Sequence, residues 1–234
     1  MIKISASSIK TFLECKRKYY YKLNRVEERV HKPTLVIGTL VHKAIEVYWN
    51  KFDEGDKYLD AQLKLFNHSS GTLYNHAFKC WDNFKLHYAN MLSDKDKVEQ
   101  FISVPYKYKT LLVGKMDRIL PGNIILDWKT GEEFNPSINN DVQFILYKEL
   151  YRRSRGIVPS DIYYVSLKYG KMIKYEDDGY SHNRLFDEII PAMIVDIKAG
   201  NFVPDGLFKY KVCKECSFRD HCFKSLENGY ELED

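Results

Sequence analysis

The residues Pro121-Gly122-Asn123 separate two apolar segments, 110–120 and 123–130, whose composition is typical of β-strands. The pattern predicts a β-hairpin, preceded by a third strand over residues 98–108. If the turn is centred on Gly122, residues equally distant from it lie opposite one another, so Asp117 faces Asp127. Lys129 then shares their face, because side chains two positions apart on a strand point the same way.

This arrangement of two carboxylates and an ammonium group predicts a cation site. Opposed carboxylates repel each other unless a cation lies between them, and Mg²⁺ prefers oxygen ligands. A lysine on the same face can position or deprotonate a water molecule that the ion holds. Asp-x-Lys is also common as a surface ion pair. In company with His42, Glu99, Gln143 and Tyr147 it favours metal-assisted phosphodiester hydrolysis.

The rest of the chain predicts helices around these strands. Helical spacing is present over residues 5–24, after Gly38, over 74–88, over 136–155 and over 181–199 with an interruption near Pro191. Residues 53–60 are polar and turn-like, and 162–167 with 172–175 form a second hairpin. We expect one α/β domain over residues 1–234, made of a helical part (1–97), a catalytic sheet core (98–180) and a C-terminal helix with a cysteine tail (181–234).

The charge distribution is uneven. The chain has 36 Lys and Arg against 32 Asp and Glu, but residues 1–32 hold nine basic and three acidic residues. Basic groups interleaved with Tyr19, Tyr20 and Tyr21 suit phosphate neutralisation and base stacking, although a solvated basic helix face is the alternative. The residues expected to contact a DNA backbone are Lys10, Arg17, Lys18 and Lys22.

The apolar runs are short. None approaches the roughly 18 residues that a membrane span needs, and residues 1–5 lack the apolar region of a signal peptide. We therefore expect a soluble, cytoplasmic protein without a membrane partner.

Five cysteines are present, and Cys213, Cys216 and Cys222 lie within ten residues. An odd number in an apparently intracellular chain favours metal or cluster ligation over disulfides. A fourth ligand is needed, for which Cys15 and His221 are candidates; Cys80 is expected to be a buried free thiol. Four thiolates fit zinc or a [4Fe-4S] cluster equally well on spacing alone.

Four motifs follow one another along the chain: Gly38-x-x-x-His42, Gly114-Lys115-Met116-Asp117-Arg118, Asp127-Trp128-Lys129-Thr130-Gly131 and Gln143-x-x-x-Tyr147. Their order and approximate spacing resemble those of the RecB-like branch of the PD-(D/E)XK nuclease superfamily. Ser5-Ala6-Ser7-Ser8, the segment from Cys15 to Tyr20 and the closing cysteines resemble the iron-sulfur members, which include CRISPR-associated RecB-like exonucleases. Those members often have proline after the first cysteine, where this chain has Lys16.

The resemblance implies a fold and a set of roles. The fold is a restriction-endonuclease-like α/β core, a mixed sheet flanked by helices, with a C-terminal iron-sulfur tail. The expected ligands of Mg²⁺ or Mn²⁺ are His42, Asp117, Asp127 and the backbone carbonyl of Trp128. Lys129 is the expected catalytic lysine, and Gln143 and Tyr147 orient substrate or support the site. The expected cluster ligands are Cys15, Cys213, Cys216 and Cys222, with Zn²⁺ as the alternative occupant.

The function implied is that of a metal-dependent DNA exonuclease acting on single strands or DNA ends, with partners in recombination, repair or CRISPR adaptation. Two alternatives stay open: a nucleic-acid-binding protein of the same fold without catalytic activity, and a zinc-stabilised nuclease or interaction module.

Overall fold

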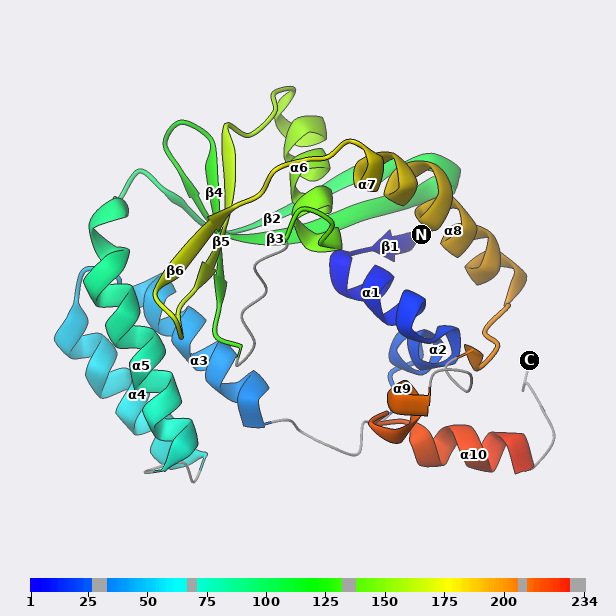
Figure 1. Cartoon of the computed structure of the whole chain (residues 1–234), viewed down its shortest axis with the longest axis horizontal. Coiled ribbons are helices and arrows are strands. Elements are labelled where there is room, and N and C mark those ends of the chain that lie inside the picture. Colours follow the sequence, from blue (N-terminus) through cyan, green and yellow to red (C-terminus); the bar gives the residue numbers. More distant parts are fainter. Residues whose placement is uncertain (27–32, 67–70, 132–137, 206–209, 228–234) are drawn as a thin grey trace.

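One mixed β-sheet forms the centre of the protein (Figure 1). The computed structural model describes residues 1–26, 33–66, 71–131, 138–205 and 210–227. The strands within this part are β1 (Ile2–Ile4), β2 (Lys97–Tyr106), β3 (Thr110–Leu120), β4 (Ile124–Lys129), β5 (Asp161–Ser166) and β6 (Lys171–Lys174). Strand β3 pairs antiparallel with β2 along one edge. Its other edge pairs with parallel β1 at the start and antiparallel β4 at the end. The sheet continues through parallel β5 to antiparallel β6.

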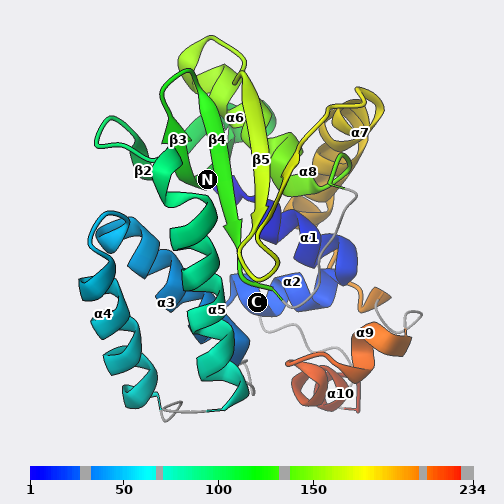
Figure 2. The ribbon, with the colours of Figure 1, turned by 60° about the vertical axis from the view of Figure 1, so that its left-hand side comes forward.

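Helices cover both faces of the sheet (Figure 2). The first face packs against α3 (Pro33–Tyr48), α4 (Phe52–Leu65) and α5 (Thr72–His87). The second packs against α1 (Ala6–Glu14), α6 (Val142–Arg155) and α8 (Ile190–Ala199). The remaining helices are α2 (Lys16–Leu23), α7 (Tyr180–Asn183), α9 (Tyr210–Lys214) and α10 (Arg219–Glu227). The chain therefore has an α/β fold with a mixed sheet flanked by helices. No helix in the described ranges is long and apolar enough to cross a bilayer.

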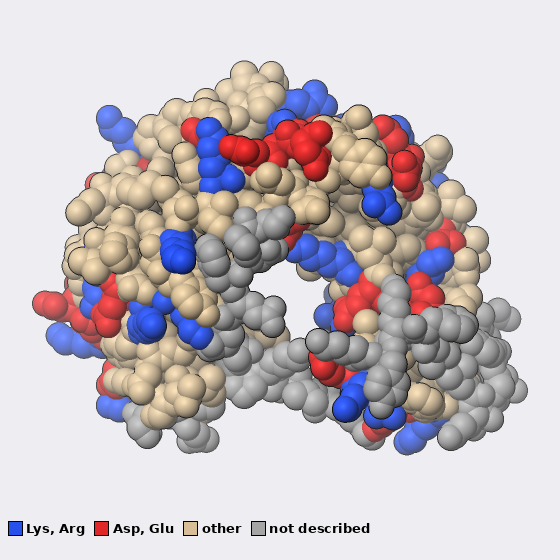
Figure 3. All heavy atoms as spheres, viewed as in Figure 1, with Lys and Arg blue, Asp and Glu red and all other residues tan. Residues whose placement is uncertain are grey.

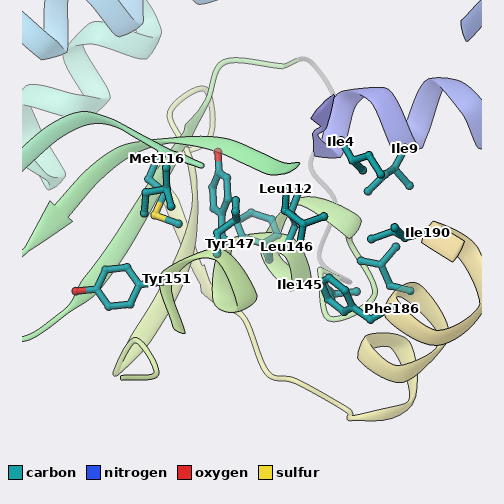
Figure 4. Close-up of a cluster of buried hydrophobic side chains, with 14 of the residues drawn as sticks. Ile4, Ile9, Leu112, Met116, Ile145, Leu146, Tyr147, Tyr151, Phe186 and Ile190 are labelled. Carbon is teal, nitrogen blue, oxygen red and sulfur yellow. The ribbon is translucent and has the colours of Figure 1, made fainter. Parts of the chain in front are cut away.

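Two apolar cores lie on the two faces of the sheet. Figure 4 shows the core under α1, α6 and α8, in which Leu112 and Met116 of β3 meet Leu146 of α6. In β4, Ile125 joins this core, whereas Leu126 and Trp128 point to the opposite core under α3 and α5. Because side chains alternate along a strand, β4 directs the residues at positions 127 and 129 toward α6.

The register predicted for the hairpin is confirmed. The Cα partners are Arg118 with Leu126, Ile119 with Ile125 and Leu120 with Ile124, all equally distant from Gly122. Gly122 has φ +82° and Asn123 has φ +64°, a left-handed conformation that glycine and asparagine adopt at least cost. The turn chemistry therefore sets which residues of β3 and β4 face each other.

The N-terminal region differs from the prediction. Residues 5–24 form two helices rather than one, because the extended backbone of Cys15 (φ −165°, ψ 123°) ends α1 and begins α2. Ile2–Ile4, for which no element was predicted, pairs with β3. The prediction of a turn over residues 53–60 was also wrong. These residues lie in α4, whose Leu59 and Leu63 are buried in the core beneath α5.

The later helices agree better with the prediction. The helix expected from residue 136 begins at Val142, after Asp141 caps it by accepting a hydrogen bond from the Gln143 amide; residues 132–137 lie outside the described part. The predicted interruption near Pro191 is confirmed, since a π-helical turn (Arg184–Ile189) precedes α8. The divisions of the chain at residues 97 and 180 stay predictions.

Candidate active site

The site lies where β3 and β4 diverge. The described pairing of β3 with β1 ends at Leu112, and its pairing with β4 begins at Arg118, so residues 113–117 have no strand ladder on this edge. Side chains satisfy backbone groups there instead. The Tyr147 hydroxyl donates to the Lys115 carbonyl (2.6 Å), and the Trp128 amide donates to Asp117 Oδ2 (2.8 Å). The gap in the ladder therefore makes room for polar side chains inside an apolar fold.

Asp127 lies at the centre of a closed polar network. Its side chain is only 1% exposed. Gln143 Nε2 donates to Asp127 Oδ1 (2.8 Å) and to the Tyr147 hydroxyl (2.8 Å), which itself lies 3.2 Å from Asp127 Oδ1. Lys129 Nζ lies 2.5 Å from Asp127 Oδ2 and donates to Gln143 Oε1 (3.0 Å). Each of these four side chains is thus fixed by at least two partners.

A second group of ligand atoms lies beside this network. His42 Nδ1 is 3.6 Å from Asp117 Oδ1. Candidate ligand atoms of His42, Glu99 and Asp117 all lie within 4.8 Å of one another. Imidazole nitrogen and carboxylate oxygens suit Mg²⁺, Mn²⁺ or Zn²⁺. These residues line a cleft with an empty volume of about 1280 Å³, part of it open to solvent, together with Lys115 and Lys129.

Glu99 belongs to this group, although no role as a ligand or catalytic residue was predicted for it from the sequence. The register of Val98 with Arg118 and Gln100 with Met116 places Glu99 opposite Asp117, yet the two are not ladder partners. Glu99 has φ +49°, an uncommon conformation for a non-glycine residue, and its carboxylate contacts Lys115 Nζ. The register of β2 with β3 brings it there, so that three neighbouring strands each place a carboxylate at this level, but the sequence does not reveal that register.

The electrostatics of the site favour positive charge. Burial lowers the pKa of His42, but the nearby Asp117 carboxylate outweighs it and raises the pKa above its usual value. Burial also lowers the pKa of Lys129, but the Asp127 carboxylate outweighs this effect and raises it. Burial raises the pKa of Asp127 itself. The carboxylates therefore stabilise cations beside them, as a divalent metal site requires.

A glycine lets α3 approach the end of β4. A Cβ atom on Gly38 would lie 3.2 Å from Thr130 Oγ1, tighter than most side-chain contacts. His42 follows one helical turn later and lines the same cleft. The spacing Gly38-x-x-x-His42 thus positions the imidazole over the carboxylates.

The structure brings the expected active-site residues together. His42, Asp117, Lys129 and the backbone of Trp128 meet at the cleft, and Gln143 and Tyr147 hold Asp127 beside it. The Trp128 ring points away and packs edge-on against Phe84. Asp127 is not in the group of three close ligand atoms, so its role as a metal ligand stays a prediction.

The four cysteines expected to act together line one cavity between α2 and the α9–α10 segment. They are Cys15, Cys213, Cys216 and Cys222. Burial and the neighbouring thiols raise the pKa of Cys213, and both effects also raise that of Cys222. Cys80 is a buried free thiol as predicted, and burial raises its pKa to about 12.

The basic residues of α1 and α2 are divided between different surroundings. Arg17 is only 7% exposed, lies over the rings of Tyr20 and Tyr21 and lines the cysteine cavity. A DNA backbone cannot reach the buried guanidinium group there, so the expected contact of Arg17 with DNA is corrected. Lys18 pairs with Glu14 (2.8 Å). The other two predicted contacts, Lys10 and Lys22, are exposed.

Comparisons with known proteins agree with this geometry. No curated protein matches the sequence. The crystal structure of a "putative exonuclease" from Eubacterium rectale matches with a TM-score of 0.63 and 16% identity, over 94% of this chain and 87% of that one, which shows a shared fold. The family model of the PD-(D/E)XK nuclease superfamily matches residues 3–223. The match spans nearly the whole sequence, and the chain therefore belongs to the PD-(D/E)XK nuclease superfamily.

Proposed function

We propose that the chain is a metal-dependent DNA nuclease that degrades single-stranded DNA or DNA from its ends. The observation that carries this proposal is the close group of His42, Glu99 and Asp117 in a cleft beside the buried Asp127–Lys129 pair. The donor set fits Mg²⁺ or Mn²⁺, because two of its three members supply hard oxygen ligands.

The residues of the site divide into ligands and positioning groups. The ion would be held by His42, Asp117, Asp127 and the Trp128 carbonyl, to which we add Glu99. When bound, it supplies Lewis-acid polarisation of the phosphodiester and activation of water.

Lys129 acts on the reacting phosphate directly. Its ammonium group, held by Asp127 and Gln143, stabilises the negative charge that develops during hydrolysis. Gln143 and Tyr147 keep Asp127 and Lys129 in place through hydrogen bonds. Removing the side chain of Gln143 or Tyr147 would leave buried polar groups without partners.

The recessed position of the site supports action on a single strand. The side chains of Asp117 and Asp127 are 12% and 1% exposed, so a phosphodiester must enter the cleft to reach them. The resemblance to RecB-like exonucleases supports action from ends.

The test compares labelled linear single-stranded, linear duplex and circular single-stranded DNA with Mg²⁺ or Mn²⁺. We expect digestion of the linear single strand by the wild type and not by Asp117→Asn, with Lys64→Gln on the exposed face of α4 as the matched control. Cutting of the circle would replace the exonuclease assignment with an endonuclease, and no digestion of any substrate would refute the nuclease proposal.

We also infer that the four cysteines hold a [4Fe-4S] cluster, with Zn²⁺ as the alternative. The fit is supported by the donor set, since thiols from both ends of the chain line one cavity. When bound, the group would link α2 to α9–α10 and restrict the unfolded chain.

Iron and sulfide analysis of anaerobically purified protein, with its visible absorption, tests the inference. We expect loss of colour in Cys216→Ser and retention in Cys80→Ala. Zinc without iron would change the assignment, and the absence of both would refute it.

A further inference from the structure

Three hollows on the described surface share lining residues. The active-site cleft shares Lys115 with a second hollow, which has an empty volume of about 530 Å³ and extends past Gln143 to Ser7 and Lys10. This hollow shares Ser7 with a third of about 560 Å³, which extends to Lys22. The three hollows therefore adjoin at Lys115 and at Ser7, and they follow one another as a path from the metal-ligand group across α1 to α2.

The chemistry along this path changes with distance from the cleft. Glu99 and Asp117 line the cleft, whereas no Asp or Glu is among the described residues that line the second and third hollows. Lysines line these instead: Lys10 and Lys115 in the second, and Lys3 and Lys22 in the third. Lys10 is 46% exposed and pairs with Asp141, the N-cap residue of α6 (2.8 Å).

Hydroxyl groups accompany the lysines. Ser7 and Thr11 lie one turn apart on α1, on the side opposite the buried Ile9 and Phe12, and both line the third hollow. Ammonium and hydroxyl donors in this mixture are the groups that contact phosphate oxygens in nucleic-acid complexes. The second and third hollows therefore match a polyanion better than the cleft does, since the cleft itself is lined by Glu99 and Asp117.

The shape of the molecule agrees with a path of this kind. Figure 3 shows a hollow in the middle of the molecule, between the side that α3 occupies in Figure 1 and the side of α1 and α2, with both basic and acidic side chains around it. The nine residues of α1 span about 13 Å. That length corresponds to about four stacked nucleotides at roughly 3.4 Å each.

We propose that this path is a binding track for the single strand that extends from the reacting phosphodiester, with Lys3, Lys10 and Lys22 as phosphate contacts. The inference rests on the proposed nuclease function and specifies its substrate contacts. A single strand is the occupant that fits, because the path starts in a recess between the sheet, α3 and α6 and continues beside one helix. The track differs from the basic helix expected from the sequence, since it includes Lys3 and leaves out Arg17 and Lys18.

Binding of a fluorescent single-stranded 12-mer in EDTA, without cleavage, tests the track. Each phosphate contact adds about 0.7 to the salt dependence of binding to a single strand, or about fivefold in affinity at 0.1 M salt. We expect the double variant Lys3→Gln/Lys22→Gln to bind about 25-fold more weakly with a salt slope lower by about 1.4. The control variant Lys64→Gln/Lys174→Gln, which removes the same charge from α4 and β6, should bind like the wild type.

Cleavage separates this inference from the proposed function. A dinucleotide is too short to reach Lys3 or Lys22, so its turnover with Mn²⁺ should be unchanged in the double variant while kcat/KM for the 12-mer falls. If the wild type cleaves neither substrate, the nuclease proposal fails, and the binding data still decide about the track. Wild-type affinity and salt slope in the double variant would overturn the track, and an equal loss of duplex binding would overturn a single strand as its occupant.

Discussion

Replacing Tyr147 by phenylalanine removes one hydroxyl group from the centre of the site. The ring keeps its volume and its edge-on contact with Phe144, so no cavity forms. The Lys115 carbonyl loses the hydroxyl that donates to it at 2.6 Å, and the Gln143 amide loses the hydroxyl that accepts from it at 2.8 Å. A buried polar group left without a partner costs about 1 to 3 kcal/mol, and we expect a loss of about 2 kcal/mol in the free energy of unfolding. Gln143 also loses one of its anchors, for which we expect a 10- to 100-fold fall in nuclease rate.

Urea denaturation in EDTA measures the stability, and digestion of single-stranded DNA with Mn²⁺ measures the rate. The control is Tyr151→Phe, one turn further along α6, whose hydroxyl donates to Asn123 at the hairpin turn (2.6 Å) and not to a site residue. This variant should lose stability but keep its nuclease rate. Equal rates in Tyr147→Phe and the wild type, or equal loss of rate in both variants, would refute the reasoning.

Three further predictions concern other parts of the structure. Gly55→Ala places a Cβ atom 2.4 Å from the buried Trp81 ring and should lower the free energy of unfolding by about 1 to 3 kcal/mol in urea; unchanged stability would contradict the packing of α4 on α5. Glu99→Gln should weaken Mn²⁺ binding at least about tenfold by calorimetry, and unaltered affinity would remove Glu99 from the site. Burial raises the pKa of Glu149, but hydrogen bonds from two arginines on α6 outweigh it and lower the pKa to about 2. Since the pKa of Glu149 is depressed in the folded state, the free energy of unfolding of the wild type should exceed that of Glu149→Gln by about 2 kcal/mol above pH 5. This difference should disappear as the pH falls toward 2, and a difference independent of pH would contradict the ion pairs.

The parts of the site that could be predicted from sequence are those fixed by local chemistry. Gly122 and Asn123 determine the hairpin turn, and the turn determines that Asp117 and Asp127 lie at one level of neighbouring strands. The helical spacing of Gln143 and Tyr147 likewise determines that both reach Asp127 from α6.

The parts that could not be predicted depend on distant packing. Glu99 reaches the site through the register of β2 with β3, which the short connection over residues 107–109 does not reveal. Arg17 lies in a basic run typical of a surface, but Tyr20 and Tyr21 cover its guanidinium group. Residues 53–60 are polar enough for a turn, yet burial of Leu59 against α5 makes them helical.

The proposed function requires that carboxylates at the divergence of β3 and β4 hold a divalent metal ion with which the protein hydrolyses DNA. The most direct measurement is single-turnover digestion of end-labelled single-stranded DNA by the wild type and Asp117→Asn, with the folding of both checked by circular dichroism. We predict that EDTA stops the wild-type reaction, that Mn²⁺ restores it, and that Asp117→Asn is slower by about 10³ or more. Digestion that persists in EDTA, or a folded Asp117→Asn protein that digests at the wild-type rate, would contradict this claim.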